Sequence, residues 1–292
     1  MRLFCAFLLL AVVPAAAAVP ATTLDVYFID VGDGDAILIE QGSTEWLIDT
    51  GYKTKWPQIG ECTSLFGIPV KKPVEHFILT HPDLDHYSAL DLVLCPCRVQ
   101  SFSSSASRAS SIRSQDELRA ARQQGCEGQA TTPLSPGADA TGVLGGDGLE
   151  WIVLHPDVGD AATPASDNDK SLVLLLSLGD VHFLFTGDLE TAPSSISNWS
   201  VPSGVVILKA PHHGSSHSAL SALMDHFRPS LVIFSTEDNI PALADSVMTR
   251  GISFLSTSTS GSIHVHTDGK TVWITTTRLS GEASSWDLGT QY

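Results

Sequence analysis

One six-residue segment in the first half of this chain places four metal-binding side chains at a single point. Residues 81–86 read HPDLDH. The run at 74–79 before them is typical of a buried strand, and 87–94 after them has the pattern of a helix start. A helix N-terminus carries partial positive charge, so carboxylates placed there offset that field and can hold a cation. The segment therefore predicts a metal centre at a strand-to-helix junction.

The residue types at 81–86 limit which metal they suit. A single His or Asp in a loop is an ordinary polar or turn-forming residue. Turn chemistry does not explain two imidazoles and two carboxylates within one such short segment. Mixed nitrogen and oxygen ligands suit zinc, manganese or iron better than calcium or magnesium.

The first 18 residues have the pattern of a secretory signal peptide. Met1-Arg2 supplies the positive start, 3–13 is apolar, and 16–18 offers an A-x-A cleavage site. The apolar run is too short for a transmembrane helix. We expect cleavage after Ala18 and a secreted or periplasmic protein with no stable membrane span. An uncleaved N-terminal anchor is the alternative.

Four cysteines remain after the predicted cleavage: Cys62, Cys95, Cys97 and Cys126. An even number in a secreted chain favours disulfide bonds. We favour Cys62 and Cys126 each bonding one member of the Cys95/Cys97 pair. A soft metal site at 95–97 is the alternative, although it has no second close pair to complete it. The sequence does not decide the pairing.

The chain is acidic, with 16 basic against 32 acidic residues and a net charge of −16. It therefore lacks the composition of a general nucleic-acid binder. Bound dications would change the balance locally, because metal ions are often the largest charges in a site. The charge weakens a nuclease hypothesis without excluding it.

The chain after the signal peptide, roughly 270 residues, is long enough for one large domain with a full core. Periodicity and turn residues predict strands at 24–29, 36–39, 46–48, 74–79, 151–154, 171–177, 181–185, 205–208, 231–234, 252–255, 263–266 and 271–275. They predict helices at 112–124, 217–227 and 240–250, and loops at 101–111 and 127–148. Each half has strands first and helices later, which indicates a layered α/β protein.

Three polar groups follow predicted strands. They lie at 81–86, at 187–188 and at 212–213. Because α/β architecture collects ligands at the carboxyl ends of strands, we expect the three groups to meet.

Seven short motifs carry a family resemblance. They read FIDVGDGDA at 28–36, LIDTG at 47–51, LTHPDLDH at 79–86, LHP at 154–156, NDKSLVL at 168–174, FTGD at 185–188 and KAPHHGS at 209–215. In this order they resemble the metallo-β-lactamase superfamily, and most of all its ComEC-like branch of hydrolase domains and free-standing secreted relatives. The resemblance implies a four-layer αββα sandwich at 24–276, followed by a C-terminal tail at 277–292.

The resemblance also implies two divalent metals, zinc or manganese. His81 and Asp83 would bind the first metal, Asp85 and His86 the second, and Asp188 would bridge them. One of His212 and His213 would complete the second site, and the other would face the substrate. Asp49 and Asp33 are expected to orient the ligands from behind.

Two departures from the superfamily pattern bear on the metal. The usual His-x-His pair is His81-x-Asp83 here, as is normal in the ComEC-like branch. A further His between the cluster and Asp188 is replaced by His155 or by Asn168-Asp169. The first site is therefore expected to be weaker or richer in oxygen ligands, which favours manganese as an occupant.

A metal-activated water attacking an ester is the mechanism that these residues suggest. Asp85 or Asp188 is expected to take the proton, and Lys209, His212 or His213 to steady the oxyanion. The predicted substrate contacts are Asn168, Ser171 and His212. Phosphodiesters of small molecules or nucleic acids rank first because the ComEC-like relatives are implicated in DNA degradation, and lactams or lactones rank second.

A binding protein with a decayed site is the non-catalytic alternative. All the expected ligands are present, which argues against decay. His264 and His266 are expected to share one face of the last hairpin, with a role at the substrate rim as one option. A transport function is not inherited with the fold, and the oligomeric state stays open.

Overall fold

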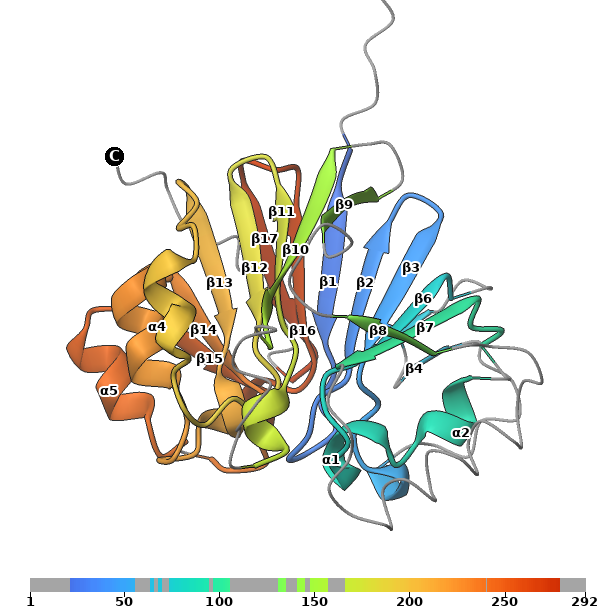
Figure 1. Ribbon diagram of the computed structural model, residues 1–292, viewed down its shortest axis with the longest axis horizontal. Helices are drawn as coiled ribbons and strands as arrows, with labels where there is room; N and C mark the ends of the chain where they lie inside the picture. Colours follow the sequence, from blue (N-terminus) through green and yellow to red (C-terminus); the bar gives the residue numbers. More distant parts are fainter. Residues whose placement is uncertain are drawn as a thin grey trace, which may run out of the picture.

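The computed structural model describes residues 22–55, 64–65, 68–69, 74–94, 97–105, 131–134, 141–144, 148–156, 166–239 and 241–278. In this part of the chain two large β-sheets stand face to face (Figure 1). The first sheet has the strand order β17-β16-β1-β2-β3-β6-β7-β8, and the second has the order β15-β14-β13-β12-β11-β10-β9.

The strands of the first sheet are β1 (Leu24–Phe28), β2 (Ile37–Gln41), β3 (Thr44–Ile48), β6 (His76–Leu79), β7 (Ser101–Ser105), β8 (Thr131–Leu134), β16 (Ile263–Thr267) and β17 (Val272–Thr276). The strands of the second are β9 (Thr141–Leu144), β10 (Leu149–His155), β11 (Val173–Leu178), β12 (Val181–Phe185), β13 (Val205–Lys209), β14 (Leu231–Phe234) and β15 (Ser253–Ser256). The strands β4 (Ser64–Leu65) and β5 (Ile68–Pro69) form a separate pair.

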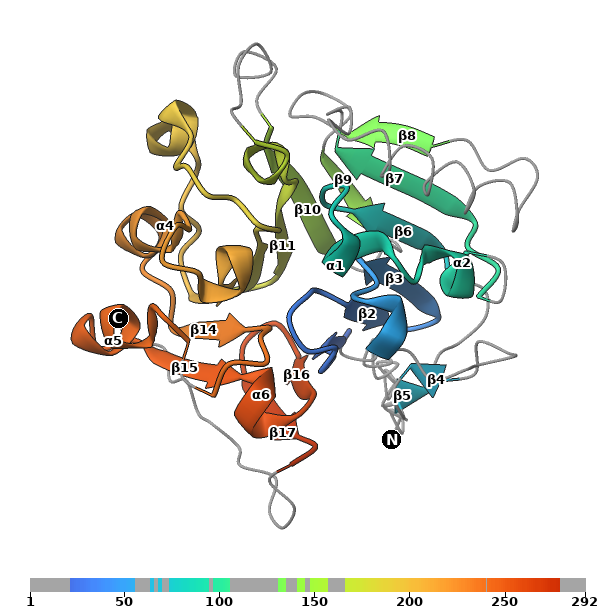
Figure 2. The ribbon, with the colours of Figure 1, turned by 90° about the horizontal axis from the view of Figure 1, so that it is seen from below.

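Helices flank the two sheets (Figure 2). The α-helices are α1 (Leu84–Tyr87), α2 (Leu90–Val93), α4 (Leu220–Phe227), α5 (Ala244–Thr249) and α6 (Thr257–Ser260). Short 3-10 turns occur at η1 (Lys53–Lys55), η3 (Asn168–Lys170), η4 (Ser194–Asn198) and η5 (Pro211–Gly214).

The main core lies between the sheets. Strand β1 alternates, with Leu24, Val26 and Phe28 fully buried and the two residues between them half-buried. Phe28 faces Phe185 of the second sheet, with ring centroids 6.2 Å apart. Burial of such a side chain contributes about 1.5–3 kcal/mol, so the inner faces hold the two sheets together.

Helices cover the outer faces. Leu90 and Val93 of α2 pack with Leu47 and Phe77 of the first sheet. Helix α4 packs its buried side chains on the outer face of the second sheet. Strands β12 and β13 are covered on both faces, which explains why their sequences are apolar except for His182 and Lys209. The predicted αββα sandwich is confirmed.

Two predicted loops were wrong in part. The serine-rich run at 101–111 begins with strand β7, where Phe102 and Ser103 are buried. Phe102 packs against Phe77 at 5.2 Å between ring centroids, so tertiary packing overrides the low strand propensity of serine. The loop predicted at 127–148 contains β8 and β9.

The helix predicted at 87–94 is split into α1 and α2. The backbone N–H of Ala89 donates to Thr50 Oγ1 at 3.3 Å, which interrupts the helical hydrogen bonds. The helix predicted at 112–124 lies outside the described residues.

Several predictions about the ends and the cysteines remain predictions. The signal peptide and most of the C-terminal tail lie outside the described residues. Cys97 is buried and disulfide-bonded, while the other cysteines also lie outside the described part of the chain. None of the described helices is long and apolar enough to cross a membrane.

Candidate metal centre

The polar groups predicted at strand ends meet at one edge of the two sheets. Strands β3 and β6 run parallel, as do β12 and β13. Their carboxyl ends therefore lie at the same edge, at the bottom of Figure 1. The segments that follow β6, β12 and β13 deliver His86, Asp188 and His213 to this edge.

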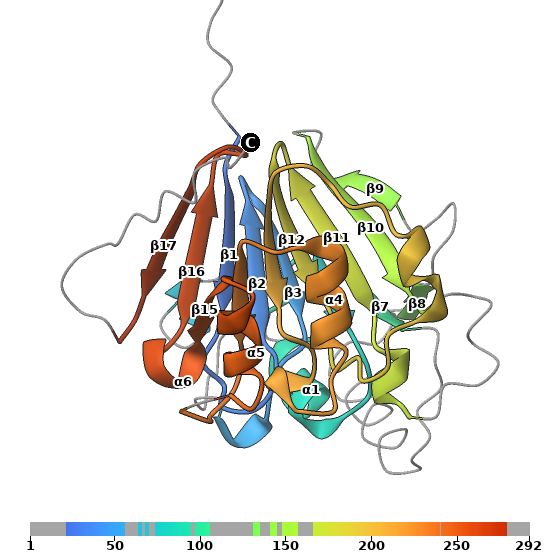
Figure 3. The same cartoon turned by 90° about the vertical axis from the view of Figure 1, so that its left-hand side faces the viewer.

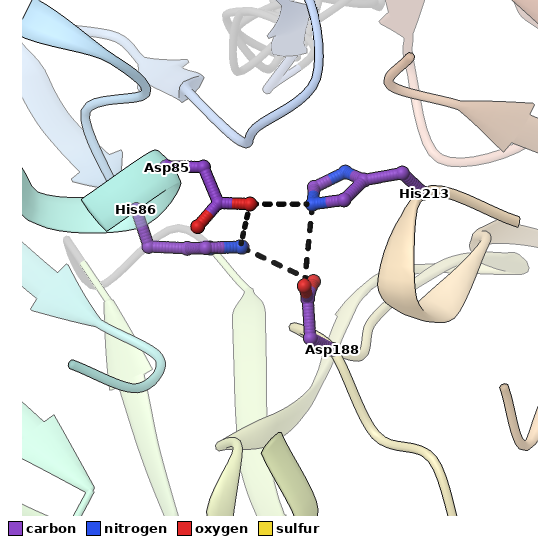
Figure 4. Close-up of side chains that lie close together, drawn as sticks. All are labelled: Asp85, His86, Asp188 and His213. Atoms are coloured by element: carbon purple, nitrogen blue, oxygen red, sulfur yellow. Dashed lines mark ion pairs between the residues drawn. The ribbon is translucent and has the colours of Figure 1, made fainter. Parts of the chain in front are cut away.

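Four of these side chains converge on one point (Figure 4). Asp85, His86, Asp188 and His213 each offer a ligand atom within 4.8 Å of the others. Nε2 of His86 lies 3.2 Å from Asp188 Oδ1, and Nε2 of His213 lies 3.2 Å from Asp188 Oδ2 and 3.4 Å from Asp85 Oδ2. Asp188 thus lies between the two imidazoles.

Three of the atoms that face this point are buried and lack well-formed hydrogen bonds. They are Nε2 of His86, Nε2 of His213 and Oδ1 of Asp188. A buried polar atom left unpaired costs about 1–3 kcal/mol, so a cluster of them calls for a ligand. Two imidazole nitrogens with carboxylate oxygens form a donor set that fits a divalent metal such as zinc or manganese.

The opposite nitrogen of each imidazole is held from behind. His86 Nδ1 lies 2.8 Å from Asp49 Oδ2, and His213 Nδ1 donates to the carbonyl of Ser235 at 2.8 Å. His81 Nδ1 lies 3.1 Å from Thr80 Oγ1. Such contacts place the ring proton on Nδ1 and leave Nε2 free to bind a metal.

Asp49 lies where the resemblance placed an orienting carboxylate. It is fully buried and accepts hydrogen bonds from Thr80 N at 2.8 Å and Thr80 Oγ1 at 2.6 Å. Its backbone φ is 56°, a left-handed conformation that is rare outside glycine. The surrounding contacts hold Asp49 in this conformation. From there its carboxylate orients the imidazole of His86 without facing the cluster itself.

The site is negatively charged and buried. Four carboxylates lie in or directly behind the cluster, and one ammonium opposes them. These groups are Asp35, Asp49, Asp85, Asp188 and Lys209. Three negative charges are therefore in excess when the imidazoles are neutral, which favours a dication at the centre.

The acid–base properties of the cluster show the same field. Burial opposes ionisation of Asp85, but the nearby imidazoles of His213 and His86 lower its pKa to about 2. Burial also opposes protonation of His213, but Asp188 raises its pKa to about 9. Against burial, Asp188 and Asp49 raise the pKa of His86 well above its usual value. A dication would therefore compete with protons for the two imidazoles.

The predicted first site is less complete. His81 is buried with Nε2 unpaired, and that atom lies 3.6 Å from Asp83 Oδ2. The rings of His81 and His86 are 4.1 Å apart between centroids. Among the described residues, however, the pair belongs to no group of three donors within 4.8 Å. The second predicted site is therefore the compact one.

The two neighbouring histidines have different surroundings. His213 belongs to the compact cluster, whereas the His212 side chain is 28% exposed with Nε2 3.9 Å from Asp188 Oδ2. His212 Nδ1 lies 3.4 Å from Glu190 Oε1, and Asn168 Nδ2 donates to that same oxygen at 3.1 Å. Both histidines have positive φ, at 49° and 54°. His212, Glu190 and Asn168 thus form one rim of the site, and Glu190 was not predicted.

Lys209 and Ser171 are placed differently from their predicted roles. Lys209 is fully buried, and its Nζ contacts Asp35 and donates to the carbonyl of Gly187 at 3.1 Å. It balances charge behind the cluster and does not face a substrate. Ser171 is also fully buried, and its Oγ accepts from Asp188 N at 2.9 Å. Ser171 therefore positions Asp188 and is not exposed for substrate contact.

Asp35 is a site residue that the sequence analysis missed. It is buried, pairs with Lys209, and has Oδ1 3.9 Å from His213 Nδ1. Its signal was a carboxylate immediately before the apolar run 36–39. The neighbouring Gly34 has φ 137°, and a Cβ there would lie 2.5 Å from the carbonyl oxygen of Asp85, so this loop packs directly on the metal-binding helix.

Three further predicted residues lie outside the cluster. Asp33 Oδ1 accepts from Thr236 Oγ1 at 2.8 Å and Glu237 N at 2.9 Å, so it fixes a neighbouring loop instead of orienting a ligand. His155 Nε2 donates to the carbonyl of Asp169 at 2.8 Å. The Asp169 carboxylate accepts from the backbone of Thr191 at 2.7 Å. His155 and Asp169 thus hold the backbone near residues 169 and 191 in place, next to the rim residues Asn168 and Glu190.

The opposite rim carries an aromatic side chain. Tyr52 is 37% exposed, and its segment is fixed to α1 because Thr50 N donates to the His86 carbonyl at 2.7 Å. Burial and then the charge of Asp85 raise the pKa of Tyr52. Lys55 follows, with Nζ 3.3 Å from Glu237 Oε2.

Sequence comparisons agree with this arrangement. A family model described as the metallo-beta-lactamase superfamily matches residues 29–229. Among curated proteins, "ComE operon protein 3" of Bacillus subtilis strain 168 is 30% identical over 233 residues, which cover 74% of this chain. The match spans 28% of that protein's length.

Solved structures share the fold at low identity. The metallo-beta-lactamase fold protein YhfI from Bacillus subtilis matches with a TM-score of 0.51 and 11% identity, covering 87% of this chain and 99% of that one. A mutant of the β-hydroxylase CmlA from Streptomyces venezuelae matches with a TM-score of 0.51 and 15% identity, covering 82% and 53%. At these identities the likeness concerns the fold alone.

Proposed function

The chain belongs to the metallo-β-lactamase superfamily and is a metal-dependent hydrolase, and from this premise we propose that it cleaves phosphodiesters. The compact cluster of Asp85, His86, Asp188 and His213 carries the proposal, because its ligand atoms gather around one point and those of His86, Asp188 and His213 are buried and unpaired. A divalent metal held there supplies a Lewis acid and lowers the pKa of a coordinated water.

The roles proposed for the cluster residues follow from how exposed their side chains are. The side chains of His86 and Asp188 are 0% and 3% exposed, and that of Asp85 is 21% exposed. Asp85 is therefore the carboxylate nearest to an incoming substrate, and we assign to it the proton taken from water. Asp188 lies between the imidazoles and holds the cluster together.

The metal content is part of the proposal. We propose two metals, zinc or manganese, with His81 and Asp83 binding the first ion and the compact cluster binding the second. The unpaired Nε2 of His81 supports this, as does its ring position 4.1 Å from that of His86. With fewer close donors, the His81–Asp83 ion is expected to be the weaker one.

The rim favours a phosphodiester. Tyr52 is a partly exposed aromatic side chain of the kind on which bases stack, and Lys55 is an ammonium in an exposed ion pair that a phosphate could exchange. The His212 imidazole is 28% exposed beside Asp188, and we assign to it a hydrogen bond to a phosphoryl oxygen. The resemblance to the ComEC-like branch supports the same substrate class.

A lactam or lactone is the second candidate substrate. The observation that favours it is the net charge of −16, because an acidic protein repels polyanions. A small, weakly charged ester would not meet this repulsion. The two candidates therefore differ in how strongly salt should affect the Michaelis constant.

Metal-reconstituted protein tests the function directly. We expect chelator-sensitive cleavage of bis-p-nitrophenyl phosphate and of a short single-stranded DNA, with little turnover of nitrocefin. Asp188→Asn should abolish turnover with the fold retained, and Asp33→Asn serves as a matched control outside the cluster. Full activity of Asp188→Asn would exclude the proposed mechanism, and turnover of nitrocefin alone would exclude the phosphodiester.

We also propose that the protein is secreted or periplasmic. The signal-peptide pattern at 1–18 and the disulfide-bonded Cys97 support this. Expression of the full chain in a bacterial host should release a protein whose N-terminal sequence begins at Val19. An unprocessed N-terminus in the cytoplasmic fraction would contradict it.

A further inference from the structure

A second group of imidazoles and carboxylate lies on the outer face of the first sheet. Strand β1 carries Asp25, and the adjacent strand β16 carries His264 and His266 (Figure 3). Val26, which follows Asp25, and Val265, which lies between the two histidines, are fully buried in the inter-sheet core. Because side chains alternate along a strand, Asp25 and the two histidines face away from that core.

These three side chains, called the outer-face triad below, meet at one carboxylate oxygen. Asp25 Oδ1 lies 2.7 Å from His264 Nε2 and 2.8 Å from His266 Nδ1. Asp25 and His266 are direct cross-strand partners. The side chains are 25–35% exposed, so solvent ions reach them. The triad shares no residue with the metal centre.

We propose that the outer-face triad binds one divalent late transition metal, of the zinc or copper(II) class. Two imidazole nitrogens and one carboxylate oxygen are ligands that these ions prefer, and calcium or magnesium would not select them. The ligand atoms all lie within 4.8 Å of one another. The fourth coordination position would open to solvent.

The geometry needs only a small adjustment. A tetrahedral zinc with bonds of about 2.0–2.1 Å separates its ligand atoms by roughly 3.3 Å. The present hydrogen-bonded separations of 2.7 and 2.8 Å would therefore widen by about half an ångström. His264 would then carry its ring proton on Nδ1 and His266 on Nε2.

Neighbouring side chains hold the two rings in place. The His264 ring is stacked on Tyr27 at 4.2 Å between centroids and 11° between planes. Its Nδ1 lies 3.4 Å from Thr275 Oγ1, a hydroxyl oxygen that can accept a hydrogen bond from the remaining ring N–H. The His266 ring lies 5.3 Å from Trp273. A metal would thus meet ligands that are already oriented.

A metal at the triad would connect distant parts of the chain. Asp25 is separated from His264 and His266 by 239 and 241 residues. An ion that binds this arrangement binds the folded state alone, and so stabilises it by mass action. We infer a structural role in which the metal ties β1 to β16.

Zinc stoichiometry distinguishes the triad from the metal centre. Untagged protein is stripped with chelator, dialysed and titrated with Zn²⁺ by calorimetry. The wild type should bind one equivalent more than the His264→Gln/His266→Gln variant. A His217→Gln/His226→Gln variant removes two histidines elsewhere and should match the wild type. Hydrolysis of bis-p-nitrophenyl phosphate should be unchanged in both.

Two further measurements keep the test decisive. Bound Cu²⁺ should quench the fluorescence of Trp273, which lies beside His266. The decrease in fluorescence on adding Cu²⁺ should therefore be smaller in Trp273→Phe. Asp25→Asn keeps the shape of the side chain and should lower the affinity of the additional site by about tenfold or more. Equal stoichiometry in wild type and a folded double variant would overturn the proposal. If the double variant does not fold, unchanged binding by Asp25→Asn would overturn it instead.

Discussion

The metal centre and the outer-face triad use the same residue types in opposite settings. At the centre, His86 and Asp188 are almost completely buried and several carboxylates share the space. At the triad, one carboxylate serves two imidazoles that are each about one-third exposed. Charge in the first setting is poorly screened, whereas water screens it in the second. The same substitution should therefore have very different effects in the two places.

The backbone differs in the same way. Asp49, His212 and His213 have φ values of 56°, 49° and 54°, conformations that cost about 1–3 kcal/mol each. The triad instead stands on the regular ladder between β1 and β16. Strain persists only where the surroundings over-determine it, so the centre depends on many contacts that the triad does not need.

The largest effect on stability is expected from Asp35. Asp35→Ala removes the carboxylate that contacts buried Lys209 and leaves it only the more distant Asp188, at 3.7 Å, which should lower the free energy of unfolding by about 3 kcal/mol. Urea denaturation of metal-free protein measures this. The paired change Asp35→Leu/Lys209→Met should recover most of the loss, because it removes both charges. A loss below about 1 kcal/mol for Asp35→Ala would mean that the pair is screened like a surface pair.

The next effect concerns metal affinity. Asp49→Asn removes the carboxylate that orients His86 through Nδ1, and such losses lower metal affinity or activity by about 10–100-fold. Competition with a coloured chelator for Zn²⁺ gives the affinity. Asp33→Asn is chemically identical but lies on the 236–237 loop contact, so its affinity should equal that of the wild type. Equal Zn²⁺ affinities of Asp49→Asn and Asp33→Asn would contradict the prediction that Asp49 orients a metal ligand and Asp33 does not.

The centre was predictable from the sequence where its residues stand in local motifs. The cluster at 81–86, Asp188 and the 212–213 pair follow strands that periodicity predicts, so their meeting at one edge follows from parallel strands. The choice of His213 over His212 was not predictable, because it depends on a local turn with two positive φ angles.

Other residues were misjudged because their roles depend on distant partners. Lys209 was expected at the substrate, but Asp35, far away in the chain, holds it in the core. Asp33 and Asp35 stand in one glycine-rich motif, and only the fold separates their roles. The serines of β7 were predicted as a loop because strand propensity does not register the packing of Phe102 on Phe77.

His76 offers a third setting, a histidine that burial alone affects. Burial lowers the pKa of His76 to about 4. By contrast, Asp188 raises the pKa of His213 to about 9. As the pH falls below 6.5, His76 becomes protonated in the unfolded chain, whereas in the folded protein it stays neutral down to about pH 4. Stability should therefore be unaffected above pH 6.5 and fall by about 1 kcal/mol at pH 5.5.

The variant His76→Gln isolates this contribution. Its unfolding free energy should decline less between pH 7 and 5.5 than that of the wild type, by about that same 1 kcal/mol. Chemical denaturation at the two pH values is the measurement. An unchanged decline would show that carboxylate partners, and not burial, dominate the acid response.

The smallest effect is expected at the triad without metal. Asp25→Ala removes two hydrogen bonds to imidazoles, but all three side chains are partly exposed, so the free energy of unfolding should fall by only about 0.5 kcal/mol. The same truncation at Asp35 should cost several times more. Denaturation in chelator measures the difference. Adding Zn²⁺ should widen the gap between wild type and Asp25→Ala, because only the wild type gains the binding energy of the additional site. A gap that is large in chelator would show that the triad is an important ion-pair network in its own right, and one that stays small with Zn²⁺ would argue against a metal there.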